Sequence, residues 1–164
     1  MMICRWLVTQ LFQWNCLERV WSILIFKMKN QYIKISLFHC SNSISPQEIN
    51  QIGSHLGQCE INTISVPCSG KIAIEYILKS IETGSDTAIL AGCMTGECKL
   101  LQGNLRARKR IDAVNNLLDE TGIGDDCVWF VQIDNKNKTE NRIDELTSCI
   151  RQIIKEQEKA TETV

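Results

Sequence analysis

A chain of 164 residues is long enough to bury a hydrophobic core as one domain, with or without an appendage. Its 18 basic and 19 acidic residues nearly cancel and are interspersed, so the composition does not indicate a nucleic-acid-binding protein, which usually has a clustered basic face. Nine cysteines are many for this length. Their odd number and the lack of a recognisable secretory signal disfavour a disulfide-bonded secreted protein and indicate a cytoplasmic metal or redox protein.

The first segment, residues 1–27, is strongly apolar, but charged residues interrupt it and its apolar runs are too short to span a bilayer. It can be read as an amphipathic anchor or partner helix, or as an extension translated from upstream of a start at Met28. We favour the second interpretation because a well-formed strand begins soon after Met28. We therefore expect an N-terminal extension (1–27), a main domain (28–157) and a polar tail (158–164).

Four short runs rich in β-branched and aromatic residues predict strands. They lie at residues 32–38, 61–67, 87–92 and 127–133.

The segments between and after these runs predict helices. Ser45, Pro46 and Glu48 form a capping-box sequence that predicts the start of the first helix, and Gly57 predicts its end. The second helix is expected to open at Ser69–Lys71. A long third helix is expected from about Lys99 to Thr121, and a fourth follows the last strand. The apolar positions at helical spacing in the third helix are Ile111, Val114, Leu117 and Leu118. Those in the fourth helix are Ile143, Leu146, Ile150, Ile153 and Ile154.

This alternation of strands and helices predicts an α/β fold. Four strands separated by helices indicate right-handed crossovers and a four-stranded parallel sheet with helices on both faces. A flavodoxin-like winding is the strand order that we expect.

Cysteines follow three successive strands of the predicted sheet. Cys40 lies just past the first strand, Cys68 ends the second, Cys93 ends the third, and Cys98 follows in the same loop. Ligands of open α/β sheets bind beyond the carboxyl ends of the strands, so we expect these four thiols to gather at one edge. Three further cysteines lie elsewhere, and we expect small buried hydrophobic residues at these positions: Cys59, Cys127 and Cys149.

The predicted helix starts after these cysteines would favour thiolates. Free N–H groups and a partial positive charge at a helix N-terminus lower the pKa of a nearby thiol. Gly70, Gly92 and Gly96 would let the backbone come close enough to donate to sulfur.

Several groups could be held by four thiolates. Structural zinc sites usually use two short Cys-x(2–4)-Cys knuckles, whereas here only Cys93 and Cys98 are close, with four residues between them. This spacing, with distant single cysteines, is more similar to plant-type 2Fe–2S ligation. A reactive dithiol or a disulfide between Cys93 and Cys98 remains open.

Two stretches, "GCMTGECKLLQGNLRARKR" and "LLDETGIGDDCVWF", resemble the delta (iron–sulfur) subunit family of methyl-viologen-reducing hydrogenase. Members of that family are also found fused to, or encoded beside, the flavin-containing subunit of heterodisulfide reductase. "VPCSGK" matches the family's Cys-Ser-Gly-Lys/Arg element, and the resemblance covers about residues 33–130. The other matching residues are Gly92, Cys93, Cys98, Gly103, Asn104, Ala107 and Arg110.

The resemblance implies a small 2Fe–2S protein that relays electrons between a hydrogenase-type donor and a heterodisulfide-reductase-type flavoprotein. Its ligands would be Cys40, Cys68, Cys93 and Cys98, and its partners that flavoprotein and hydrogenase subunits. We see no catalytic acid, base and nucleophile, so catalysis would belong to these partners. Two rival interpretations are a cluster-free assembly or structural component of the same complex and a zinc-holding module.

The chain departs from the family pattern at two places. Ser43 stands where the family has a further cysteine, and "DNKNKT" replaces the family's small-residue turn after the fourth strand. His39 could act as a ligand in the manner of Rieske centres, although a neighbouring histidine is more often not one. The basic run Arg106–Arg110 is usually a solvated helix face, with docking of an acidic partner as the alternative.

Overall fold

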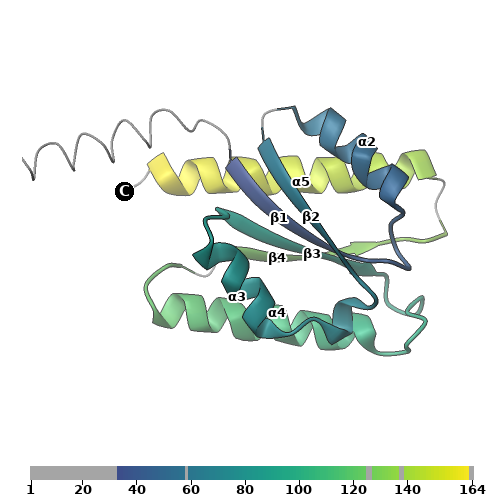
Figure 1. The fold of residues 1–164 in the computed structure, drawn as a ribbon, viewed down its shortest axis with the longest axis horizontal. Coiled ribbons are helices and arrows are strands. Elements are labelled where there is room, and N and C mark those ends of the chain that lie inside the picture. Colours follow the sequence, from purple (N-terminus) through teal and green to yellow (C-terminus); the bar gives the residue numbers. More distant parts are fainter. Residues whose placement is uncertain (1–32, 58, 125–126, 137–138, 163–164) are drawn as a thin grey trace, which may run out of the picture. The chain divides into compact units, whose positions relative to one another are not determined.

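The computed structural model describes residues 33–57, 59–124, 127–136 and 139–162. The expected extension, 1–27, lies outside these residues. The described chain alternates strands and helices as predicted (Figure 1). The strands are β1 (Ile33–Cys40), β2 (Cys59–Val66), β3 (Thr87–Cys93) and β4 (Val128–Ile133). The helices are α2 (Pro46–Leu56), α3 (Ile74–Glu82), α4 (Gly103–Glu120) and α5 (Thr139–Glu162), together with the short 3₁₀ helix η1 (Ser69–Lys71).

The four strands form one parallel sheet in the order β2-β1-β3-β4. This is the order of the first four strands of a flavodoxin-like sheet, so the predicted winding is confirmed. At the centre, Leu37 of β1 lies opposite Ile89 of β3. Because all strands run the same way, their carboxyl ends meet at one edge (right-hand side of Figure 1).

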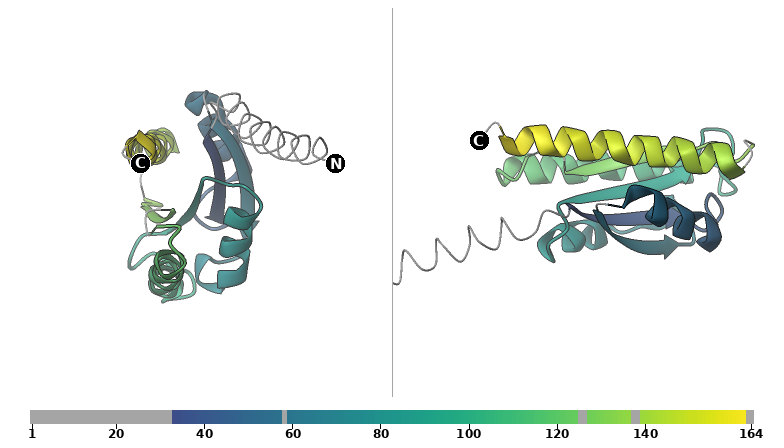
Figure 2. Two further views of the ribbon diagram at one scale, coloured as in Figure 1. Left: turned by 90° about the vertical axis from the view of Figure 1, so that its left-hand side faces the viewer. Right: turned by 90° about the horizontal axis from the view of Figure 1, so that it is seen from above.

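Helices cover both faces of the sheet, with α2 and α5 on one face and α3 and α4 on the other (Figures 1 and 2). Each face has its own hydrophobic core. The first contains Ile35, Leu37, Ile52, Ile89, Leu146 and Ile150. The second contains Phe38, Ile77, Leu90, Ile111, Val114 and Leu118. Within the described ranges, no helix combines the length and the apolar character that crossing a bilayer requires.

The start of α2 follows the predicted capping box. The Ser45 hydroxyl accepts a bond from the Glu48 N–H at 3.4 Å, and the Glu48 carboxylate accepts one from the Ser45 N–H at 2.8 Å. Gly57 ends the helix with a φ of +44°, which glycine adopts without a Cβ penalty.

Two predicted helix starts are wrong. The third helix begins at Gly103 and not at Lys99, because Leu101 has a left-handed φ of +59° and its N–H bonds to the Cys98 carbonyl oxygen in a turn at 2.9 Å. Ser69–Lys71 forms only the 3₁₀ turn η1, because Gly70 packs directly on the backbone of Gly103, and α3 starts at Ile74. Leu117, expected in the core, is 43% exposed.

Candidate functional site

The four predicted cysteines lie at the carboxyl edge of the sheet. Cys40 and Cys93 are the last residues of β1 and β3, Cys68 lies between β2 and η1, and Cys98 lies in the loop between β3 and α4. Cys40, Cys68 and Cys93 are buried, whereas Cys98 is partly exposed. All four are free thiols.

Cys40 and Cys93 form the first pair. The Cys93 thiol interacts with the Cys40 thiol and also with the side chain of Asn135, which follows β4. The Cys40 sulfur in turn lies 3.9 Å from the carbonyl oxygen of Pro67, the residue before Cys68. The ends of all four strands therefore contribute to the surroundings of this pair.

Cys68 and Cys98 form the second pair, and both lie against Gly103, the first residue of α4. A Cβ placed on Gly103 would lie 2.6 Å from the Cys68 sulfur and 2.9 Å from the Cys98 sulfur. Both thiols thus rest on the first residue of α4, where only glycine leaves room for them. An electrostatic interaction between Cys93 and Cys98 connects the two pairs.

The arrangement is one of pairs and not of a single tight group. Among the residues that the structure describes, no three His, Cys, Asp or Glu side chains form a group that could hold one metal ion. The geometry instead offers two thiols from β1 and β3 and two from the loops before η1 and α4.

The environments of Cys93 and Cys98 shift their acidities in opposite directions. Burial and the neighbouring Cys40 raise the pKa of Cys93 to about 11, although Asn135 acts in the opposite direction. Burial also acts to raise the pKa of Cys98, but the N–H groups of Leu100, Asn104 and Gly103 and the Cys68 thiol outweigh it and lower the pKa. The start of α4 therefore favours a thiolate at Cys98.

The contact between η1 and α4 holds Cys68 beside Cys98. The Arg110 guanidinium donates a hydrogen bond to the carbonyl oxygen of Gly70. A Cβ on Gly70 would overlap the carbonyl oxygen of Gly103, so the two backbones are in direct contact. Sequence analysis assigned Gly70 a close approach, but it did not identify Gly103 as the partner.

The segment after β4 also contacts the loop that carries Cys98. The backbone N–H of Asn135 donates to the Glu97 carboxylate at 2.9 Å, and the Lys136 ammonium lies 3.2 Å from the same carboxylate. In the "DNKNKT" stretch, Asn135 and Lys136 thus contact the loop that carries Cys98. Sequence analysis missed these contacts because they join residues far apart in the chain.

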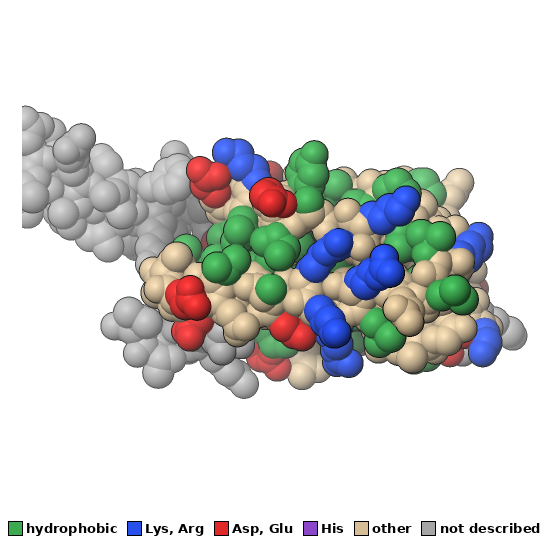
Figure 3. All heavy atoms as spheres, turned by 90° about the horizontal axis from the view of Figure 1, so that it is seen from below, with side chains coloured by type: hydrophobic (Ala, Val, Ile, Leu, Met, Phe, Trp, Pro, Cys, Tyr) green, Lys and Arg blue, Asp and Glu red, His purple; other side chains and the backbone are tan. Residues whose placement is uncertain are grey.

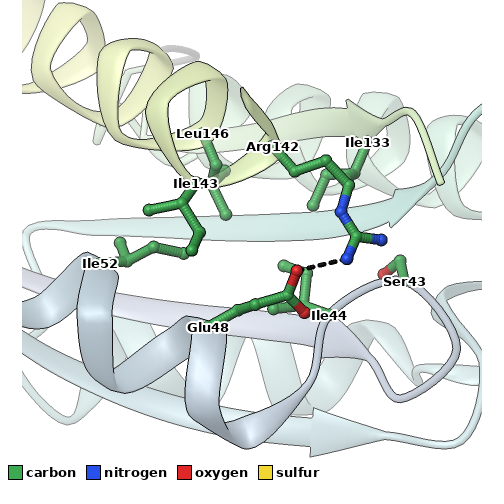
Figure 4. Close-up of a pocket in the computed structure, with 8 residues that line it drawn as sticks. All are labelled: Ser43, Ile44, Glu48, Ile52, Ile133, Arg142, Ile143 and Leu146. Atoms are coloured by element: carbon green, nitrogen blue, oxygen red, sulfur yellow. Dashed lines mark hydrogen bonds and ion pairs between the residues drawn. The ribbon is translucent and has the colours of Figure 1, made fainter. Parts of the chain in front are cut away.

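Ser43 bonds to the backbone and lines a pocket. Its hydroxyl donates to the Cys40 carbonyl oxygen at 2.9 Å, and the residue lines a small pocket between α2 and α5 with Glu48 and Arg142 (Figure 4). His39 is buried, and burial lowers its pKa below the usual value despite an opposing backbone bond at Cys40. As neighbours on a strand, His39 and Cys40 point to opposite faces of the sheet.

Asn104 leaves a polar donor at the candidate site. The residue is 1% exposed, and its Oδ1 accepts a bond from the Leu105 N–H at 2.9 Å. Its Nδ2 has no hydrogen-bond partner among the described residues. The start of α4, whose backbone N–H groups lower the Cys98 pKa, thus also holds a buried amide donor without a partner in the described part of the chain.

The remaining described cysteines lie away from these pairs. They are half-buried and not fully buried as expected: Cys59 packs on the core under α2 and α5, Cys127 packs on the core under α3 and α4, and Cys149 lies in α5.

Comparisons with known proteins agree with the resemblance seen in the sequence. Residues 35–153, well over half of the chain, match the family described as methyl-viologen-reducing hydrogenase, delta subunit. The chain is 32% identical over 95 residues to the vhu iron-sulfur subunit of the F420-non-reducing hydrogenase of Methanocaldococcus jannaschii, covering 57% of this chain and 71% of that protein. The corresponding protein of Methanopyrus kandleri is 40% identical over 63 residues, or 38% of this chain and 48% of that one.

A second kind of relative is much longer. It is one of the subunits of the ferredoxin:CoB-CoM heterodisulfide reductase of Methanosarcina mazei, and it is 35% identical over 63 residues, which are 38% of this chain and 8% of that protein. The family match and the Methanocaldococcus relative decide the classification: the chain belongs to the methyl-viologen-reducing hydrogenase delta subunit family.

Proposed function

We propose that this chain is the electron-transfer component of a hydrogenase–heterodisulfide reductase type of complex, and that Cys40, Cys68, Cys93 and Cys98 hold a 2Fe–2S cluster. The cluster would accept and release single electrons. Electrons would pass between a hydrogenase-type donor and a heterodisulfide-reductase-type flavoprotein. The names of the relatives support this assignment, since they include hydrogenase iron-sulfur subunits and one of the heterodisulfide reductase subunits.

The observation that carries the proposal is the meeting of two thiol pairs at one edge of the sheet. A 2Fe–2S cluster takes four protein ligands, two on each iron. The pair Cys40/Cys93 would supply two ligands to one iron, and the pair Cys68/Cys98 would supply two to the other. A zinc ion would instead need its four ligands around a single point, so the paired arrangement favours the two-iron cofactor.

Other groups at the site suit a negatively charged cofactor. The backbone N–H groups of Leu100, Gly103 and Asn104 stabilise a thiolate at Cys98, and the Asn104 amide has a donor to spare. Hydrogen bonds to sulfur and the degree of exposure are two of the factors that set the potential of such a cluster. Cys98, the partly exposed member, would give electrons their shortest route to the surface.

Iron and acid-labile sulfide assays on anaerobically purified protein test the cofactor. We expect about two irons and two sulfides per chain, as for one Cys4-ligated cluster, with charge-transfer absorption in the visible spectrum and an electron paramagnetic resonance signal after reduction. One zinc ion without sulfide would establish the zinc-holding module. A well-folded chain with neither metal nor sulfide would establish the cluster-free alternative.

Ligand exchange tests the residues. Cys68→Ser and Cys93→Ser each remove one member of a different pair, so both should abolish or alter the visible spectrum. Cys149→Ser is the matched control, because Cys149 lies in α5 away from the four thiols, and it should leave the spectrum unchanged. An unaltered spectrum in both site variants would contradict the assignment.

A further inference from the structure

The charges of α4 run against its helix dipole. Basic residues occupy its first half and include Arg106, Arg108 and Lys109, whereas Asp119 and Glu120 lie at its end. Its first turn has no acidic residue and its last turn has no basic one. Helices gain stability from the opposite arrangement, so this distribution does not serve the stability of α4.

The positive charge is concentrated on one part of the surface. Figure 3 views the molecule from below, and most of its Lys and Arg side chains lie in the right half. This is the half in which α4 starts (Figure 1), and most Asp and Glu side chains lie in the left half. Arg106, Arg108 and Lys109 have no ion-pair partner in the described part of the chain. They line an open groove of about 520 Å³ together with Gln102, Leu105 and Asp112.

Leu105, which lines this basic groove, and its chain neighbours Leu100 and Leu101 are exposed. Leu100 is 53% exposed, Leu101 86% and Leu105 47%. Leu101 also has a φ of +59°, a left-handed conformation that is unfavourable for a leucine. A leucine that is both strained and turned to solvent gains nothing from the fold itself, whereas strained residues often occur at binding sites.

The same segment carries the partly exposed candidate ligand. Leu100 and Leu101 follow Cys98 within the loop, and the Leu101 N–H donates to the Cys98 carbonyl oxygen at 2.9 Å. A protein seated on the leucines would therefore cover the edge of the site at Cys98.

We propose that Leu100, Leu101, Leu105, Arg106, Arg108 and Lys109, here called the α4 patch, form the docking surface for an acidic redox protein. The partner would place an apolar contact on the leucines and Asp or Glu side chains in the basic groove. Three exposed leucines favour a protein over a nucleic acid, because apolar anchors surrounded by polar residues are typical of protein interfaces. This inference rests on the proposed function, and it commits to the heterodisulfide-reductase-type flavoprotein as the partner.

Binding of that purified flavoprotein from the same organism tests the inference, with association and dissociation rates measured at several salt concentrations. Arg106→Glu combined with Lys109→Glu should slow association about tenfold or more at low salt, because complementary charges act mainly on the association rate. Lys79→Glu combined with Lys155→Glu is the matched control. It makes the same change in net charge outside the α4 patch and should leave association nearly unchanged.

Leu101→Gly separates docking from folding. Glycine adopts the left-handed conformation freely, so this variant should be as stable as the wild type or more so. Loss of the leucine contact should nevertheless speed dissociation about tenfold. The iron content and visible spectrum should match those of the wild type, which shows that the effect is on docking and not on the cofactor.

The outcomes distinguish the two proposals. Unchanged binding by both α4-patch variants would overturn the docking surface, even if the cluster is present. The docking surface would also be overturned if the wild-type chain did not bind the flavoprotein, or if it bound a DNA or RNA duplex through the patch instead. A chain without iron that still binds the flavoprotein through the α4 patch would support the docking surface and overturn the electron-transfer proposal.

Discussion

Gly103 lies directly against the sulfur of Cys68, since a Cβ on this glycine would come within 2.6 Å of that atom. Crowding by the two thiols, and not an unusual backbone angle, is the reason for glycine here, because Gly103 is not among the described residues with positive φ. The thiols of two separate loops thus pack together against the first residue of α4.

Replacing this glycine should displace both thiols. In Gly103→Ala we expect the iron content per chain to fall and the visible spectrum to change. The free energy of unfolding should change by no more than about 1 kcal/mol, because the better helix propensity of alanine offsets part of the crowding. Iron assays and urea unfolding of the same preparation measure both effects.

Gly53→Ala provides the matched comparison. Gly53 lies within α2, and a Cβ there would meet nothing within 4 Å. This variant should raise the free energy of unfolding by about 0.5–1 kcal/mol and leave the iron content unchanged. Equal iron contents in the two variants would show that Gly103 has no special role.

Arg110 should act as a positioning residue for Cys68. Arg110→Met removes the charged donor to the Gly70 carbonyl oxygen, and we expect a loss of about 1.5–3 kcal/mol in unfolding free energy. The reduction potential of the proposed cluster should also shift, because η1 is no longer held on α4 and can move Cys68, the residue before it, away from Cys98. Arg108→Met lies on the exposed side of α4 and should change stability by less than about 0.5 kcal/mol. If the two variants behave alike, the contact with Gly70 does not position the site.

Features set by neighbouring residues could be predicted from the sequence. The capping box at Ser45 and the end of α2 at Gly57 depend on local backbone geometry, and the prediction was right at both. The strands were located to within a few residues because their apolar runs are continuous. The gathering of cysteines followed from topology alone, since parallel strands end at one edge.

Features set by distant contacts could not be predicted. The sequence places Lys99–Gln102 at the start of a helix by propensity, but in the fold Leu101 has a left-handed φ of +59° and the helix begins only at Gly103, which lies against the sulfurs of Cys68 and Cys98. The division into the pairs Cys40/Cys93 and Cys68/Cys98 depends on how η1 packs on α4. The contact of Asn135 with Cys93 joins residues too far apart in the chain for any spacing rule.

The thiols of the metal-free protein should titrate separately. Only the thiolate reacts with iodoacetamide, so each alkylation rate rises as pH passes the pKa of that cysteine. The lowered pKa of Cys98 predicts a rise below pH 9, whereas the pKa of about 11 predicts that Cys93 reacts appreciably only near pH 11. Mass spectrometry of the peptides, after timed alkylation at each pH, gives the two profiles. Coincident profiles, or a Cys93 profile at lower pH than that of Cys98, would contradict these environments.

The ion pair between Glu48 and Arg142 should stabilise the packing of α2 on α5. The side chains of Glu48 and Arg142 are 8% and 18% exposed and point toward each other (Figure 4). Glu48 Oε2 also accepts the Ser45 N–H of the capping box. Removing one partner of a buried pair leaves the other charge uncompensated, so Arg142→Met should lower the free energy of unfolding by about 3 kcal/mol in urea.

Removing both partners should cost less than the sum of the single losses. In the double variant Glu48→Met and Arg142→Met no buried charge is left without its partner, and similar replacements in other proteins are often neutral. Loss of the capping box limits the recovery, because a cap contributes about 1 kcal/mol. We therefore expect the double variant to be more stable than Arg142→Met alone by about 1–2 kcal/mol.

Lys155→Met, exposed on α5, should differ from the wild type by less than about 0.5 kcal/mol. Strictly additive losses at Glu48 and Arg142 would mean that the two charges do not stabilise each other, and that α2 and α5 are held by their apolar contacts alone.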